Sequence, residues 1–116
     1  MHGKLIVLIP RGDELHMENF YDEIMYGIGA DYIGDRMFGS NAESIYERFT
    51  TALNSIDTSK MTVRDSMEYD RDYPVVIFDN VFPSIVFRSF VQYKAYCDFY
   101  ELWFGEYDWQ VWDFHF

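Results

Sequence analysis

Residues 4–10 of the chain read KLIVLIP, a short run of apolar, largely branched side chains that a proline closes. A continuous apolar run of this length is typical of a strand buried on both faces of a sheet, and proline removes the donor that further pairing would need. A second run of this kind, VVIF at residues 75–78, ends at Asp79-Asn80. We therefore predict that these two segments pair at the centre of one sheet.

Three other segments repeat apolar side chains every three or four residues, which indicates helices. They cover about residues 13–27, 40–56 and 83–104. Asp13 is the expected N-cap of the first helix, and two glycines near its end, Gly27 and Gly29, are expected to stop it. Ser40 and Glu43 have the spacing of a capping box at the start of the second helix.

Two further strands are expected. Alternation of apolar and polar side chains over residues 61–69 predicts a half-solvated strand, and residues 107–116 are rich in aromatic and β-favouring side chains. The order strand, helix, helix, strand, strand, helix, strand predicts an α+β fold. It matches the split βαβ ferredoxin-like sandwich, with a four-stranded sheet, helices on one face and an extra helix in the first crossover. Other α+β topologies remain open.

The composition is that of one acidic domain spanning residues 1–116. The chain has 20 acidic and 9 basic side chains, a net charge of -11, and 49% apolar residues, enough for a single core. A single cysteine, Cys97, excludes an intramolecular disulfide and fits a reducing compartment. No apolar run approaches the roughly 18 residues of a membrane span, and no signal peptide is evident. We therefore expect a cytoplasmic protein.

The sequence contains no catalytic motif. Three histidines, His2, His16 and His115, are far apart in the chain, and Cys97 shares a predicted helix face with apolar residues. A zinc site would need close His or Cys partners, so we expect neither a metal nor another cofactor. Asp79, which follows a buried strand, leaves open a metal-dependent hydrolase as the third choice of function. Our prediction is that the chain is not an enzyme.

Acidic side chains are concentrated in two stretches. Seven lie between Arg11 and Arg36, where there is no Lys or Arg. In the predicted first helix, Glu14, Glu18 and Asp22 would form one row with about 6 Å between neighbours, and Glu23 would flank it.

The second concentration follows Lys94, after which no basic residue appears. Glu106, Asp108 and Asp113 are its predicted binding residues. Trp109 and Trp112 point to opposite faces of the predicted final strand, so one of them would reach the open face of the sheet as an apolar anchor.

An ordered array of carboxylates can occupy a basic groove that otherwise binds a phosphodiester backbone. A net charge of -11 without a basic patch argues against direct binding of nucleic acid. The sequence thus predicts a non-enzymatic binding protein that blocks a basic, nucleic-acid-binding surface of a larger protein. The predicted binding residues are Glu14, Glu18, Asp22, Glu23, Glu106, Asp108, Asp113, Trp109 and Trp112.

In its short length, acidity and aromatic content, the chain is similar to small phage-encoded inhibitors of host nucleic-acid enzymes or defence systems, some of which imitate DNA. The resemblance implies a viral anti-defence protein that acts in the host cytoplasm on a basic host or defence protein. The alternative prediction is a self-associating structural or adaptor domain, a homodimer built on the aromatic sheet face. Acidity that serves only solubility also remains open.

Overall fold

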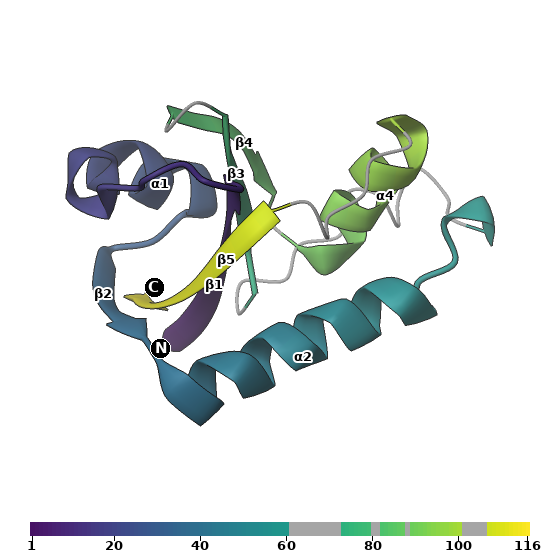
Figure 1. Cartoon of the computed structure of the whole chain (residues 1–116), viewed down its shortest axis with the longest axis horizontal. Helices are drawn as coiled ribbons and strands as arrows, with labels where there is room; N and C mark the ends of the chain where they lie inside the picture. Colours follow the sequence, from purple (N-terminus) through teal and green to yellow (C-terminus); the bar gives the residue numbers. More distant parts are fainter. Residues whose placement is uncertain (61–72, 80–81, 88, 101–106) are drawn as a thin grey trace.

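The computed structural model describes residues 1–60, 73–79, 82–87, 89–100 and 107–116 (Figure 1). In these residues, five strands form one mixed sheet in the order β2-β5-β1-β3-β4. The strands are β1 (His2–Pro10), β2 (Tyr32–Met37), β3 (Val75–Asp79), β4 (Phe82–Phe87) and β5 (Tyr107–His115). β1 and β3 are parallel, and the other neighbours are antiparallel.

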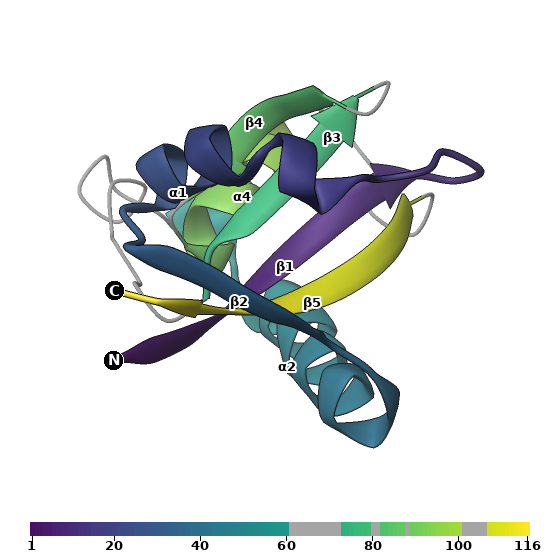
Figure 2. The same cartoon turned by 90° about the vertical axis from the view of Figure 1, so that its left-hand side faces the viewer.

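Helices cover both faces of this sheet. Figures 1 and 2 show α1 (Tyr21–Ile28) on one face, and α2 (Gly39–Ser55) and α4 (Phe90–Tyr100) on the other. Two short 3-10 helices, η1 (Met17–Asn19) and η2 (Thr58–Lys60), precede α1 and follow α2. The described part of the chain has no helix that is both long and apolar enough to cross a bilayer.

The position of β1 at the centre of the sheet explains why its apolar run is continuous. Leu5, Val7 and Ile9 pack against the α1 side of the sheet, while Ile6 and Leu8 pack against the α2 and α4 side. All five side chains are buried. Because successive side chains of a strand point to opposite faces, a strand with helices on both sides must be apolar at every position.

The predicted pairing of the two apolar strands is confirmed, with Val7 opposite Val76. The final strand is confirmed as β5, and the second predicted helix as α2. The ferredoxin-like arrangement is not confirmed. The sheet has five strands rather than four, and its helices lie on both faces rather than one. The predicted strand at residues 61–69 lies outside the described residues.

Two strands, β2 and β4, lie in segments where the sequence predicted no strand. β2 lies in the predicted connection between the first two helices, and β4 occupies the start of the predicted third helix. β4 pairs with β3 as an antiparallel hairpin, which moves the start of the helix to Phe90. Ser89 marks this start, because its buried hydroxyl accepts a hydrogen bond from the backbone N–H of Gln92 at 3.2 Å.

The helix ends differ in part from the prediction. The capping box at Ser40 does not form, because α2 begins one residue earlier, after Phe38, and lacks a side-chain cap bond. Gly29 does end α1, in the left-handed conformation with φ of 69°. Gly27 lies within α1 instead of ending it. A Cβ atom at Gly27 would lie 3.1 Å from both methyl groups of Val86, so this glycine permits close approach of α1 to β4.

A polar contact ties η2 to α4. The Asp98 carboxylate accepts a hydrogen bond from the Thr58 hydroxyl. It also forms an ion pair with Lys94, whose Nζ lies 3.1 Å from Asp98 Oδ1. The Thr58 hydrogen bond lowers the pKa of the Asp98 carboxyl, with Lys94 adding to the effect and partial burial opposing it.

We expect Asp98 to make a small contribution to acid stability. A carboxyl with a lowered folded-state pKa stabilises the fold above its unfolded pKa of about 4, and the stabilisation is lost as the pH falls through the folded value. Because Asp98 is 40% exposed, the effect should be below about 1 kcal/mol. Urea unfolding of D98N and the parent chain at pH 7 and pH 3 measures it. If the free energies of unfolding of D98N and the parent chain differed more at pH 3 than at pH 7, this role of Asp98 in acid stability would be contradicted.

Candidate functional site

The segment predicted as one helix from residue 13 to residue 27 is divided in two. Residues 13–16 are irregular, η1 follows, and α1 begins only at Tyr21. Phe20 interrupts the helix with φ of -128° and ψ of 11°. Its ring packs edge-on against Phe78 of β3 at 5.5 Å, while Met17 is buried nearby. Packing of Phe20 on the sheet therefore interrupts the helix that the sequence predicted.

As a consequence, the predicted helical row of Glu14, Glu18 and Asp22 is wrong, since each of the three lies in a different local structure. All three side chains are nevertheless exposed, and so is Glu23 in the first turn of α1. The Nε2 atom of His16 lies 3.8 Å from Glu14, and its Nδ1 atom lies 3.7 Å from Glu18. These acids share the α1 side of the molecule without regular spacing.

Two more exposed acids extend this group to the edge of the sheet. Asp31 immediately precedes β2 and Asp35 lies within it. His115 Nδ1 lies 3.8 Å from Asp31 Oδ2. Asp13, exposed in the irregular segment before Glu14, is the seventh acid. We call these seven exposed residues the α1–β2 acidic surface: Asp13, Glu14, Glu18, Asp22, Glu23, Asp31 and Asp35. Among the described residues, the ion pairs of this surface involve only histidines.

Of the three acids predicted to bind a partner near the C-terminus, Asp113 is paired within the chain. Asp113 forms an ion pair with Lys4 of the neighbouring strand at 2.5 Å, and His2 lies 3.3 Å from its other oxygen. Partial burial alone would raise the pKa of Asp113, but Lys4 and His2 outweigh it and hold the pKa below its usual range. Asp113, predicted as a partner-binding residue, is therefore already paired with a lysine of its own chain. Asp108 is exposed, and Glu106 lies outside the described residues.

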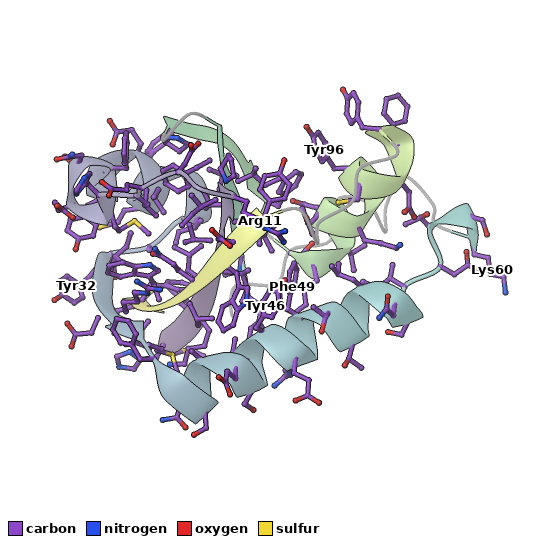
Figure 3. All side chains as sticks on the ribbon, viewed as in Figure 1. Arg11, Tyr32, Tyr46, Phe49, Lys60 and Tyr96 are labelled. Atoms are coloured by element: carbon purple, nitrogen blue, oxygen red, sulfur yellow. The ribbon has the colours of Figure 1, made fainter. Side chains whose placement is uncertain are left out.

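The two tryptophans do point to opposite faces of β5, as predicted. The ring of Trp109 stacks on Tyr46 of α2, with centroids 4.3 Å apart, and Figure 3 shows Tyr46 beside the sheet. On the α1 side, Trp112 packs against the core and its Nε1–H donates to Gln110 at 2.9 Å. Neither is an anchor on an open sheet face, because helices cover both faces.

Other aromatic side chains of the described residues are strongly exposed, and the sequence analysis named none of them as an anchor: Tyr26, Tyr32, Phe38, Phe99 and Tyr100. Tyr26 of α1 is 90% exposed and Tyr32 of β2 is 63% exposed. Figure 3 shows Tyr32 directed away from β2 at the edge of the sheet. Both residues belong to the elements that carry the α1–β2 acidic surface. Tyr26 could have been recognised, since it falls between Ile24 and Ile28 on the polar side of α1.

Within the described ranges, no group of three or more His, Cys, Asp or Glu side chains is arranged to hold a metal ion. A shallow groove follows α2 and is lined by Ser44, Glu47, Arg48, Thr51 and Ala52. It opens widely to solvent, so it does not enclose a small ligand.

Asp79 is the last residue of β3, and its backbone pairs with Phe82 of β4.

The lone thiol has the environment of a core side chain. Cys97 is buried on α4 next to Tyr93, and this burial raises the pKa of the thiol although a hydrogen bond with Tyr93 opposes the shift. A thiol reacts as its thiolate, so Cys97 should be inert in the folded state. We expect iodoacetamide to modify it at least about tenfold more slowly in the native chain than in urea at pH 8. Equal rates would show that Cys97 is accessible.

The chain matches no protein-family model, no curated protein and no solved structure. Its function must therefore be inferred from its own residues, and the α1–β2 acidic surface is the feature that most needs an explanation.

Proposed function

We propose that this chain is a non-enzymatic binding protein that blocks a basic, nucleic-acid-binding surface of a larger protein. The observation that supports the proposal is the α1–β2 acidic surface. It contains seven exposed carboxylates within 23 residues of chain, and its ion pairs in the described residues are all with histidines. The stretch of chain that carries these seven acids contains no Lys or Arg, so its own side chains leave the surface negative.

Electrostatics explains how such a surface would find its target. A chain with net charge -11 repels nucleic acid and attracts basic proteins over distances of about the Debye length, roughly 8 Å at physiological salt. A protein that binds DNA presents closely spaced cations to phosphates that lie about 3.4 Å apart along each strand. Carboxylates on a rigid support can take the place of these phosphates.

The folded core provides that rigid support. Ile24 and Ile28 of α1 are buried against the sheet, and Ile33 fixes β2 on the same side. The acids of both elements are therefore held on ordered backbone. Tyr26 and Tyr32 add large exposed rings beside these acids, and tyrosine supplies contact area at low entropic cost. These two tyrosines replace Trp109 and Trp112 as the proposed anchors.

The alternative of a self-associating adaptor has less support. It required an aromatic sheet face that was open to a second copy, and α1, α2 and α4 cover both faces of the described sheet (Figure 2). The hydrolase alternative is not favoured by any specific contact of the described residues.

The proposal is tested in two steps. First, the immobilised chain is incubated with host lysate at low salt, and bound proteins are eluted by a salt gradient and identified. Second, each purified target is mixed with a fluorescent DNA duplex, and the chain is added as competitor. We expect a basic target whose DNA is displaced by the chain. Failure to capture a salt-sensitive target, or capture of targets that keep their DNA, would overturn the proposal.

A further inference from the structure

The first strand and the last strand place two histidines side by side. His2 of β1 is directly opposite His115 of β5 in the antiparallel register. Side chains of directly opposed residues lie on the same face of a sheet, close enough to interact. The two imidazole rings meet edge to face, with centroids 5.3 Å apart and an angle of 78° between their planes. Figures 1 and 2 both show the two ends of the chain adjacent to each other.

Each imidazole faces a carboxylate through the same ring nitrogen. His2 Nδ1 lies 3.3 Å from Asp113 Oδ2, and His115 Nδ1 lies 3.8 Å from Asp31 Oδ2. A proton on Nδ1 that points to a carboxylate leaves a lone pair on Nε2. The N-terminal amino group of Met1 lies 3.1 Å from His115 Nε2, which fits this tautomer, and a metal ion bound at Nε2 would displace that amino group. Histidines that bind metals are commonly oriented by a carboxylate in this way.

The carboxylate behind His2 is itself held in place. Lys4 Nζ lies 2.5 Å from Asp113 Oδ1, so the other oxygen is left to face His2. Gly34 of β2 lies against the same side chain, since a Cβ atom there would be 3.4 Å from Asp113 Oδ2. The lysine and the close approach of Gly34 together limit the positions that Asp113 can adopt.

The spacing of the rings fits a shared metal ion. Zinc binds imidazole nitrogen at about 2.0–2.1 Å, which places each ring centre about 3 Å from the ion, and two such rings at a tetrahedral angle have centres about 5 Å apart. The observed 5.3 Å is close to this value. Imidazole nitrogen favours zinc, copper and nickel ions, whereas magnesium and calcium prefer oxygen ligands.

We propose that His2 and His115 form a surface site for a zinc-type divalent cation, with Asp113 and Asp31 as positioning residues for the two rings. The site has two protein ligands, so water completes the coordination, and both rings are accessible because their side chains are 65% and 44% exposed. A bound ion would bridge the ends of β1 and β5. The site shares Asp31 with the α1–β2 acidic surface, but zinc binding is measured without the protein partner of the proposed function.

Zinc binding is measured by calorimetric titration of ZnCl2 into the chain without an affinity tag. We expect one saturable equivalent that survives 1 mM MgCl2. H2Q and H115Q should each weaken binding by at least about tenfold, since loss of even an outer-shell partner costs 10–100-fold. Co²⁺ added in place of zinc should give a visible absorption band that both variants reduce.

His16 provides the matched control, because it also lies between two carboxylates, Glu14 and Glu18, but no second imidazole of the described residues pairs with its ring. H16Q should bind zinc as the parent chain does. Circular dichroism in EDTA checks that all three variants fold. Absence of saturable binding, full binding by H2Q and H115Q, or an equal loss in H16Q would each overturn the assignment.

Discussion

Reversing two charges of the α1–β2 acidic surface should slow association with the basic target at least about tenfold at low salt. In E18K/D22K the net charge changes from -11 to -7, and two cations replace exposed carboxylates on the α1 side. Encounter between oppositely charged surfaces is accelerated by one to three orders of magnitude, and rim charges act mainly on the association rate. Stopped-flow or surface plasmon resonance measurements at 50 mM and 300 mM NaCl give the rate and its dependence on salt.

The matched control is E43K/E47K, which produces the same net charge of -7 by reversing two exposed acids of α2. α2 covers the opposite face of the sheet from α1. If the contact is the α1–β2 acidic surface, this control should keep an association rate within about threefold of the parent chain, because only the long-range attraction changes. Equal losses in the two variants would show that net charge alone, and no particular surface, determines binding.

Buried strands were the most predictable elements of this fold. The runs at residues 4–10 and 75–78 must be apolar on both faces because helices cover both sides of the sheet, and this requirement is visible in the sequence. The edge strand β2 was not predictable, since Ile33 is the only fully buried side chain in Tyr32–Met37. Its strand conformation depends on pairing with β5, a contact between residues distant in the chain.

The start of α4 shows a different cause of error. The apolar spacing from Pro83 onward resembles a helix, yet residues 82–87 pair with β3 as a strand. Short apolar runs fit both structures, so periodicity alone does not separate them. Ser89 and Gln92 have the spacing of a helix cap, and this local pattern would have located the true start.

The candidate site was predictable in composition and not in geometry. The absence of Lys and Arg between residues 12 and 35 is a property of the sequence, and all seven acids there are exposed. Their arrangement was missed because Phe20 packs on Phe78 and interrupts the helix. The pairing of Asp113 was missed for a similar reason: Lys4, its partner, is 109 residues away in the chain.

Replacing Phe49 by alanine should destabilise the fold by about 3–5 kcal/mol, the range measured when a buried phenylalanine is truncated. Phe49 of α2 is fully buried, and its ring lies 5.0 Å from Phe90 and 5.5 Å from Tyr93 of α4 (Figure 3). Its loss would leave a cavity between both helices and the sheet. Urea unfolding followed by tryptophan fluorescence measures the change, and Y26A, at a 90% exposed position, is the control with an expected change below about 0.5 kcal/mol.

This prediction bears on function because it tests whether α2 and α4 really occupy their face of the sheet. If they do, neither face of the sheet is available to a partner, and recognition must use helix surfaces and the sheet edge, where the α1–β2 acidic surface lies. A loss of less than about 1 kcal/mol in F49A would mean that α2 is not firmly packed. The face that carries Trp109 would then again be a candidate interface, and the preference for the acidic surface over self-association would lose its structural basis.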